Sequence, residues 1–376
     1  MNCCFRPESR AKCCSPAPRS GSSSVRARGS RTVPQPPPSR RKELEGRGTV
    51  SDIAALASQP RSRLALGTLG FGTTQNRDAS FALLDAFIEE GGRLIDSAHV
   101  YGNWDRSVPP SASERMVGAW MSSRGVSGDV SATTKIGHPS LDDPGATRLD
   151  PELLRLDIEE ARDNFGLETI PLVYLHRDST AIPVEELLAP LEAFTREGLI
   201  AAYGASNWTT PRLKESREIA ADRGWAGFTV NQPCWGLARR LERALPGGMV
   251  AMDEAMHRFH EQSALPVSPY SSQSRGYFSR WRRGGADTAV RDFDDEHNRA
   301  IALHLDELAP SYGLPATELS VAVLLASSFP VMPVIGTGTV DQLRSSFRAT
   351  SVQVSTVDLE AVRALSGFPV VQRHGD

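Results

Sequence analysis

Four titratable side chains follow three consecutive apolar segments that we predict to be strands. Asp96 ends the segment 93–96 and Tyr101 comes five residues later, while Lys135 and His176 lie at the ends of the next two segments. A carboxylate, a phenol, an ammonium and an imidazole are groups that enzymes use to move protons. If the three strands end at one rim, the sequence indicates a site for acid–base chemistry.

Each of the four residues also has an ordinary structural interpretation. Asp96 could cap the next helix, and Tyr101 could be a half-buried core aromatic. A single lysine at a strand end is usually solvated, and a single histidine is usually structural. Three consecutive strand ends that together supply four such groups are less expected by chance, which favours one shared site.

The elements that must position these groups alternate between short apolar runs and amphipathic helices, beginning near residue 62. Helical periodicity is clear in 77–90, which stops at two glycines, and in 151–165, which follows an Asp-Pro pair suited to a helix start. Eight strand-plus-helix units fill roughly 300 residues, and their strands are nearly continuously apolar. This pattern predicts the α/β class, with parallel strands closed into a (β/α)8 TIM barrel. We expect strands near residues 64–72, 93–96, 129–136, 170–176, 199–204, 227–232, 265–268 and 331–335.

An open, doubly wound sheet is the alternative to a closed barrel. Such a sheet usually carries a G-x-G-x-x-G turn after its first strand, where a dinucleotide meets the N-terminus of a helix. Gly67, Gly70 and Gly72 come close to this pattern but differ from it in spacing, and no helix follows them directly. The barrel is therefore the better prediction.

Composition separates a basic leader from the predicted barrel. The first fifty of the 376 residues hold eleven Arg or Lys against three Asp or Glu, whereas the whole chain has a net charge of −3. We therefore expect residues 1–55 to be a disordered tail rich in Arg, Ser and Pro, and residues 62–370 to form the barrel. The tail could be a transit peptide or another leader, or could result from a start codon placed too far upstream.

Cysteine usage indicates a reducing compartment. Four of the five cysteines lie in the tail, as Cys3-Cys4 and Cys13-Cys14, and the rest of the chain holds only Cys234. A body of this size with one thiol is no disulfide scaffold, so a cytoplasmic location is expected unless the tail directs the chain to an organelle. The adjacent cysteine pairs lack the spacing of a zinc site, so we expect no metal.

No apolar run approaches the ~20 residues that span a membrane, and neither a membrane nor a nucleic-acid partner is expected.

Short motifs at the predicted strand ends follow one another in a recognisable order. They are a glycine turn at 67–72, IDSAHVYG at 95–102, SER at 113–115, a lysine at 135, YLHRD at 174–178, GASNW at 204–208, NQPCW at 231–235, PYSS at 269–272 and IGTGTVDQL at 335–343. Together they resemble the aldo-keto reductase family, over about residues 62–350. The resemblance implies a TIM-barrel oxidoreductase that reduces a small-molecule aldehyde or ketone with a nicotinamide cofactor.

The resemblance further implies that Asp96, Tyr101, Lys135 and His176 form the catalytic tetrad. Hydride addition to a carbonyl leaves an alkoxide, so an acid must supply a proton as charge develops. Tyr101 would supply it, because a phenol is protonated at neutral pH and the Lys135 charge would stabilise the phenolate that remains. Asp96 would hold the lysine charged and in place, and His176 would position the carbonyl by a hydrogen bond.

Cofactor contacts follow from the same resemblance. Ser206, Asn207 and Gln232 would hydrogen-bond the nicotinamide carboxamide, and Tyr270 would stack on the ring. The other expected cofactor-binding residues are Ser271, Ser272, Gly336, Thr337, Gln342 and Ser346.

The coenzyme is expected to be NADP, with NAD as the alternative. In this family the loop after the last strand commonly carries a cation for the 2′-phosphate and later an asparagine for adenine. Gly338 and Ser346 occupy the corresponding positions in this chain, so Arg344 or Arg348 would have to meet the phosphate instead.

The substrate pocket is expected to be walled by Trp104, Trp208 and Trp235, with the aromatic and basic segment 276–292 as its lip. The sequence does not indicate the oligomeric state. Two other functions remain open: an NADP-binding regulatory or sensor subunit built on the same barrel, and a Schiff-base lyase or aldolase that uses Lys135 as its nucleophile.

Overall fold

The computed structural model describes residues 53–59, 62–143, 145–283 and 287–367. These residues all belong to one unit of the chain, Arg47–Asp376. The expected tail, residues 1–55, lies outside the described residues except for its last three. Those three begin a short helix, α2 (Ile53–Ser58), which the sequence pattern did not predict.

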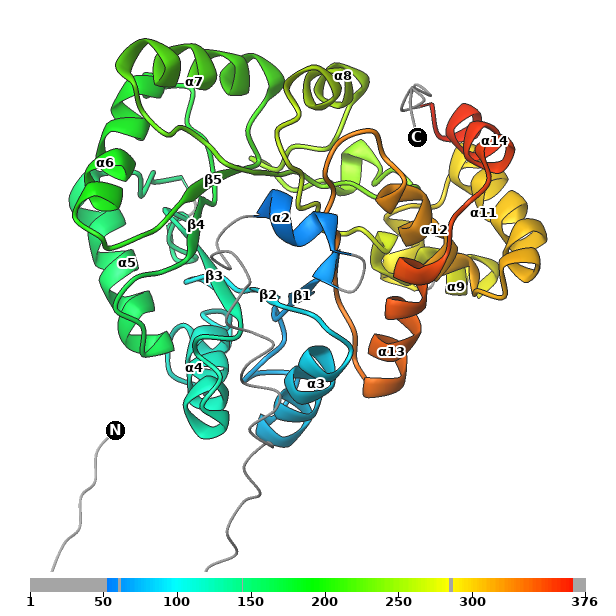
Figure 1. The fold of residues 1–376 in the computed structure, drawn as a ribbon, viewed down its shortest axis with the longest axis horizontal. Helices are drawn as coiled ribbons and strands as arrows, with labels where there is room; N and C mark the ends of the chain where they lie inside the picture. The colour runs from blue at the N-terminus through cyan, green and yellow to red at the C-terminus, as the bar shows by residue number, and fades with distance from the viewer. Residues whose placement is uncertain (1–52, 60–61, 144, 284–286, 368–376) are drawn as a thin grey trace, which may run out of the picture. The chain divides into compact units, whose positions relative to one another are not determined.

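Seven parallel strands form one sheet at the centre of this unit (Figure 1). Their spatial order is β6-β5-β4-β3-β2-β1-β7, so neighbours in the chain are neighbours in space except where β1 meets β7. The register places Asp96 of β2 beside Gly67 of β1 and Thr133 of β3. The strands are β1 (Ala65–Gly67), β2 (Leu94–Asp96), β3 (Ser131–Ile136), β4 (Leu172–Leu175), β5 (Tyr203–Ser206), β6 (Asn231–Gln232) and β7 (Val334–Ile335).

The predicted strand 265–268 is reduced to one bridging residue, Val267. It forms isolated parallel bridges with Asn231 of β6 on one side and with Val331, shortly before β7, on the other. Prolines precede and follow it within two residues, and a proline has no N–H to extend a ladder of backbone hydrogen bonds. The two bridges complete the ring between β6 and β7. The predicted TIM barrel class is therefore confirmed, with one expected strand shortened to a single residue.

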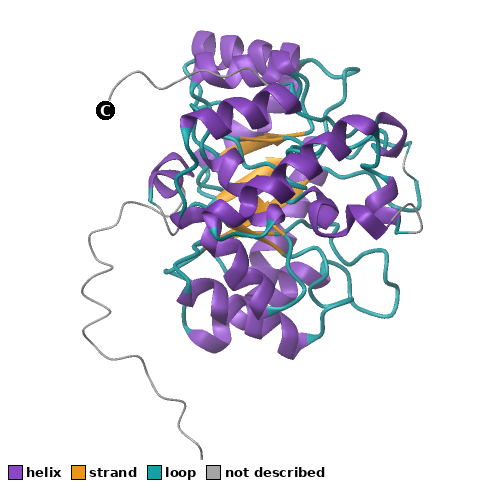
Figure 2. Ribbon diagram, turned by 90° about the vertical axis from the view of Figure 1, so that its right-hand side faces the viewer, coloured by secondary structure: helices purple, strands orange, loops and turns teal. Residues whose placement is uncertain are grey.

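Helices surround the strands on the outside (Figure 2). Asp150 caps α5 as predicted, because its carboxylate accepts from the Glu152 N–H at 2.9 Å, and Gly166 ends the helix at a φ of 68°. The helices are α3 (Arg77–Glu89), α4 (Ala112–Arg124), α5 (Pro151–Phe165), α6 (Val184–Arg196), α7 (Thr210–Arg223), α8 (Glu254–Ser263), α9 (Tyr277–Arg280), α10 (Thr288–Arg291), α11 (Glu296–Leu308), α12 (Ala316–Leu325), α13 (Val340–Arg348) and α14 (Thr356–Ser366).

No single helix in the described ranges is long and apolar enough to cross a membrane. Among the described helices, one pair, Glu296–Tyr312 and Ala316–Leu325, passes that test by length and composition when taken together, although it is bent by 87°.

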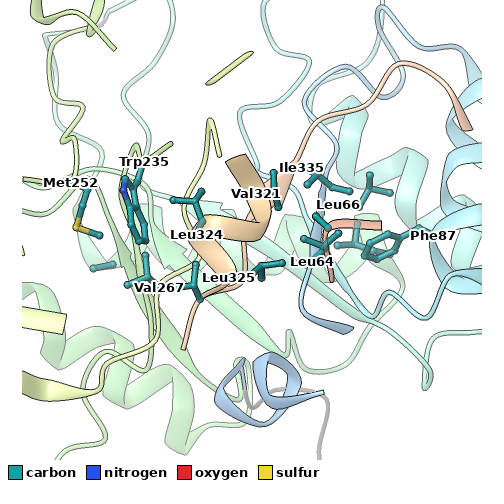
Figure 3. Close-up of a cluster of buried hydrophobic side chains, with 14 of the residues drawn as sticks. Leu64, Leu66, Phe87, Trp235, Met252, Val267, Val321, Leu324, Leu325 and Ile335 are labelled. Atoms are coloured by element: carbon teal, nitrogen blue, oxygen red, sulfur yellow. The ribbon is translucent and has the colours of Figure 1, made fainter. Parts of the chain in front are cut away.

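The main hydrophobic core lies between the strands and the surrounding helices (Figure 3). Leu66 of β1 and Ile335 of β7 are fully buried against Phe87 of α3 and Val321 of α12. Removing these apolar side chains from water is the main term that favours the closed barrel.

A second cluster seals the N-terminal end of the barrel. Leu56 and Ala57 of α2 join Ala65, Leu94 and Leu172, the first residues of β1, β2 and β4. Figure 1 shows α2 drawn across the middle of the ring. Because parallel strands all start at one end, α2 covers the end opposite the strand ends that carry the titratable groups.

Replacing Gly118 of α4 by Ala is expected to destabilise the protein. Ala normally favours a helix over Gly by about 1 kcal/mol. Here a Cβ would lie 1.9 Å from the Asn164 carbonyl oxygen of α5, so the two helices would have to move apart. We expect the free energy of unfolding in urea to fall by about 1–3 kcal/mol, as for other overpacked cores. Gly128→Ala is the matched control, since nothing lies within 4 Å of its Cβ position. Equal stability of the two variants would contradict the expectation.

His260 of α8 should make the fold sensitive to acid. Its ring is fully buried, with Nδ1 donating to the Leu265 carbonyl at 2.9 Å and Nε2 3.0 Å from Asn231 Nδ2. Burial lowers the pKa of His260 to about 4. The unfolded chain, with a histidine pKa of about 6.5, therefore binds more protons between these values, and stability falls as the pH drops through this window.

A His260→Gln variant tests this prediction. We expect the loss of unfolding free energy between pH 7 and pH 5 to be about 2 kcal/mol smaller in the variant than in the wild type. Urea titrations at the two pH values measure it. An identical pH dependence in both proteins would show that His260 is not the responsible group.

Candidate active site

The ends of β2, β3 and β4 bring the four predicted titratable groups to one rim of the barrel. Asp96 is the last residue of β2, Lys135 is the penultimate residue of β3, and His176 directly follows β4. Tyr101 lies in the loop after β2, where its N–H donates to the Ala98 carbonyl at 2.9 Å in a tight turn. Parallel strands that end together at the C-terminal rim explain this convergence.

Lys135 is the centre of the cluster. Its Nζ donates to Asp96 Oδ2 at 2.7 Å, to the Ser97 carbonyl at 2.6 Å and to the Tyr101 hydroxyl at 3.2 Å. These three contacts use all three protons of the ammonium. Lys135 and Asp96 are each only 2% exposed, so the charge is paired inside the protein rather than by water.

The electrostatics of this cluster keep the lysine charged and the phenol protonated. Burial alone would lower the pKa of Lys135, but its interactions with the Asp96 carboxylate and the Tyr101 hydroxyl outweigh burial and raise the pKa above the usual value. Burial raises the pKa of Tyr101, and this outweighs the opposing effect of the Lys135 charge. The lysine therefore limits the rise in the pKa of the phenol, which holds its proton at neutral pH.

His176 is a buried, neutral imidazole beside the phenol. Its ring lies edge-on to the Tyr101 ring with 6.1 Å between centroids. Burial and then the neighbouring Arg177 charge hold the pKa of His176 well below its usual range. Its Nδ1 is buried and has no hydrogen-bond partner among the described residues. A neutral ring of this kind can donate one hydrogen bond to a ligand oxygen without adding charge.

Gln232 and Asn207, expected to bind a carboxamide, contact the protein here. Gln232 Nε2 donates to Asp96 Oδ1 at 2.9 Å, so this amide orients the carboxylate. Asn207, at a positive φ of 63°, accepts from the Tyr270 hydroxyl at 2.7 Å and donates to the His176 carbonyl at 3.1 Å. Ser206 Oγ donates to the Gln232 carbonyl at 3.0 Å. These residues line up beside the tetrad and stabilise its geometry.

The predicted cofactor loops after Val267 and β7 are tied together by Gln273, which sequence reasoning did not single out. Its Nε2 donates to Ser346 Oγ at 3.0 Å and its Oε1 accepts from the Gly336 N–H at 3.0 Å. Within the second loop, Gln342 Oε1 accepts from the Gly338 N–H at 2.8 Å. The only sequence signal was the position of Gln273 inside the polar run 271–274.

The other residues discussed in and near these loops differ in backbone conformation and in the groups that they contact. Ser271 has a positive φ of 59°, while Ser272 is fully buried and donates to the Val334 carbonyl at 2.6 Å. Arg344 lies 3.5 Å from Glu89, and Arg348 donates to the Gly313 carbonyl, so both arginines have partners other than a phosphate.

Two buried polar atoms fit a bound dinucleotide. Gln232 Oε1 beside the tetrad and Thr337 Oγ1 in the loop after β7 have no hydrogen-bond partner in the part of the chain described. A carboxamide N–H and a phosphate or ribose oxygen are groups that could pair with them. Within the same ranges, no three His, Cys, Asp or Glu side chains are grouped to hold a metal ion.

The expected substrate pocket needs correction. Trp104 is 47% exposed and its ring centroid lies 6.4 Å from that of Tyr101, as a pocket wall would. Trp208 is fully buried against Phe228, and Trp235 is 5% exposed and stacks on Phe329. Both are core residues with almost no surface for a substrate.

The expected lip at 276–292 is also wrong for its first aromatic residues. Tyr277 and Phe278 of α9 are buried in the main core, at 0% and 2% exposure. Tyr277 and Phe278 therefore stabilise the barrel instead of contacting a ligand.

Comparison with known proteins agrees with this fold. The model of the Aldo/keto reductase family matches residues 63–366, which is most of the chain. The norsolorinic acid reductase stcV of Emericella nidulans is 26% identical, with 90% of this chain and 85% of that protein covered. The aryl-alcohol dehydrogenase GME11368 of Pestalotiopsis microspora is 23% identical, with 89% and 86% covered. The uncharacterized oxidoreductase YrpG of Bacillus subtilis is 26% identical, with 82% and 92% covered.

A solved structure supports the fold independently. The crystal structure of the thermostable aldo-keto reductase Tm1743 with the inhibitor epalrestat matches with a TM-score of 0.59 at 20% sequence identity. The match covers 81% of this chain and 94% of that one. Because the family model spans the whole barrel, from before β1 to the end of α14, the chain belongs to the aldo/keto reductase family.

Proposed function

We propose that this oxidoreductase reduces an aldehyde or ketone to the alcohol with NAD(P)H, and that Tyr101 supplies the proton. One observation carries the proposal: the Tyr101 hydroxyl lies 3.2 Å from a fully paired, buried Lys135 ammonium. A protonated phenol beside a fixed cation is a general acid whose conjugate base is stabilised where it forms.

The side chains of the rim then have distinct tasks. A bound reduced nicotinamide supplies the hydride to the carbonyl carbon. Tyr101 gives its proton to the carbonyl oxygen, and the Lys135 charge stabilises the phenolate that is left. His176, which is neutral, donates a hydrogen bond that orients the oxygen. Asp96 balances the lysine charge and is itself held by Gln232.

The residues that would hold the cofactor lie along the same rim. Gln232 Oε1 is the acceptor for the carboxamide, next to Ser206 and Asn207, and Tyr270 flanks the ring. The phosphates and ribose are assigned to the loops tied by Gln273, through Ser271, Ser272, Gly336, Thr337, Gln342 and Ser346. We propose NADP as the coenzyme, with Arg344 as the cation for its 2′-phosphate, since this arginine is 52% exposed and its carboxylate contacts are long at 3.5 and 3.6 Å.

Two rival functions are less well supported. A Schiff-base enzyme needs a neutral lysine, whereas the pKa of Lys135 is raised by Asp96 and Tyr101. A regulatory subunit needs no proton donor, yet all four tetrad groups converge here. The relative named as an aryl-alcohol dehydrogenase favours an aromatic substrate, which the exposed ring of Trp104 could contact.

Tyr101→Phe is expected to remove the reductase activity while the fold and cofactor binding persist. The variant keeps the ring but has no proton to give, so kcat/KM for 4-nitrobenzaldehyde should fall by about 10²–10⁴-fold. The loss of reduced-nicotinamide absorbance measures it. Tyr312→Phe is the control, because that hydroxyl contacts Asp358 and Ser355 away from the rim. Near-normal turnover by Tyr101→Phe would refute the assignment.

Coenzyme choice provides a second test. We expect kcat/KM to be at least tenfold higher with NADPH than with NADH, and Arg344→Gln to reduce this ratio severalfold, because a guanidinium–phosphate contact is absent with NADH. Arg115→Gln, an exposed arginine on α4, is the control for loss of one positive charge. A preference for NADH in the wild type would reverse the assignment of NADP.

A further inference from the structure

Arg177, next to the tetrad histidine, is a half-buried cation that pairs with no acid in the described part of the chain. One terminal nitrogen donates to the His176 carbonyl at 2.9 Å, and the other lies 3.3 Å from His138 Nε2. A guanidinium has five N–H donors and keeps its charge at any physiological pH. Most of its donors, and the whole of its charge, are therefore unmatched by the protein.

Arg212, also half-buried, shows how a guanidinium can be neutralised within this fold. Its guanidinium forms two hydrogen bonds to Asp178, at 2.8 and 3.0 Å, and two more to the carbonyls of Ser179 and Ile182. Burying a cation without such compensation is costly. Arg177 lacks these partners, so its guanidinium has the free donors and the charge to bind an anion from outside the chain.

His138 fixes the direction of the Arg177 guanidinium. Its Nδ1 donates to the Pro139 carbonyl at 2.7 Å, which leaves Nε2 as the acceptor that faces Arg177. The His138 ring also lies 4.7 Å, centroid to centroid, from the ring of His176. The aliphatic part of the Arg177 side chain lies close to Gly248. A Cβ built at Gly248 would be 3.5 Å from the Arg177 Cδ.

The charge of Arg177 reaches the reacting end of the site. It is one of the charges that act on the hydroxyls of Tyr101 and Tyr270, lowering the pKa of each against the larger effect of burial. His138, which contacts the guanidinium, has its ring 4.7 Å from that of His176, and the His176 ring lies 6.1 Å from that of Tyr101. An anion bound by Arg177 would therefore lie near the carbonyl that Tyr101 protonates. The loops expected to hold the cofactor phosphates follow Tyr270 and β7, which leaves the substrate as the source of the anion.

We propose that Arg177, oriented by His138, binds an acidic group of the substrate, so that the enzyme selects carbonyl compounds carrying a carboxylate close to the reacting carbonyl. A planar guanidinium can meet a carboxylate with two parallel hydrogen bonds. The inference rests on the proposed function, because it names the substrate class of the same site.

The test compares charged and neutral aldehydes of similar shape. The 2-, 3- and 4-carboxybenzaldehydes are each paired with the matching nitrobenzaldehyde, and kcat/KM is measured with NADPH for wild type and Arg177→Gln. For at least one pair we expect the carboxy-to-nitro ratio to fall by about 10- to 100-fold in the variant, mainly through KM. A change below fivefold in every pair would contradict the proposal.

Two further variants separate recognition from structure. Arg177→Lys keeps the charge but loses the planar fork, so its ratio should lie between those of wild type and Arg177→Gln. Arg106→Gln removes an exposed cation near Trp104, and its ratio should equal that of wild type. A merely structural role for Arg177 would reduce the turnover of both aldehydes equally and leave the ratio unchanged, which counts against the proposal.

Failure of the proposed function would give a different result. If wild-type protein turned over no nitrobenzaldehyde, the reductase assignment would fail, while titration calorimetry with the carboxybenzaldehydes would still report anion binding. In this titration we expect the Kd for the carboxybenzaldehyde to be at least fivefold higher in Arg177→Gln than in the wild type. An unchanged Kd, or a loss confined to NADPH binding, would overturn the role of Arg177.

Discussion

The buried ion pair between Lys135 and Asp96 is the constraint on which the rim of this barrel depends. An ammonium and a carboxylate that are both withdrawn from water are tolerated only when their remaining hydrogen bonds are satisfied. The Ser97 carbonyl, the Tyr101 hydroxyl and the Gln232 amide satisfy them. The contacts that stabilise the pair thus also fix the phenol, so the stability of the rim and the acid–base chemistry proposed for it share one set of atoms.

Strand register explains how residues far apart in the chain meet at this pair. Asp96 ends β2, and Lys135 lies on the neighbouring strand two residues beyond Thr133, the partner of Asp96 in the register. Residues two apart on a strand point to the same face. Lys135 can therefore reach back along the barrel interior to the carboxylate, and a one-residue shift between β2 and β3 would turn it to the helix side.

Much of this arrangement could be predicted from the sequence, because it depends on the hydrophobic periodicity of the segments and on the order of strands and helices along the chain. Apolar runs separated by helical periods predicted the parallel barrel, and Asp150 with Pro151 predicted the start of α5. The four titratable groups were predicted to meet because the C-terminal ends of parallel strands share a rim. None of these inferences required knowledge of how individual side chains pack.

The errors concern side chains whose direction is set by tertiary packing. A tryptophan after a strand can face the mouth or the core, and Trp208 and Trp235 face the core. Helix α2 is too short to be stable alone and exists because Leu56 and Ala57 cover the strand starts. The sequence did not single out Arg177 beside His176, because only the folded structure shows that no acidic side chain pairs with it.

The single-residue junction at Val267 makes the wall of this barrel unequal around its circumference. Between β6 and β7 the ring is held by isolated bridges, whereas β3 and β4 share four paired residues. Opening motions should therefore begin at this seam, where Pro266 and Pro269 interrupt the ladder of backbone hydrogen bonds. The polar loops linked by Gln273 emerge on either side of it. A dinucleotide bound across those loops would link the two sides of the junction at Val267. The barrel wall should therefore be more rigid when coenzyme is bound.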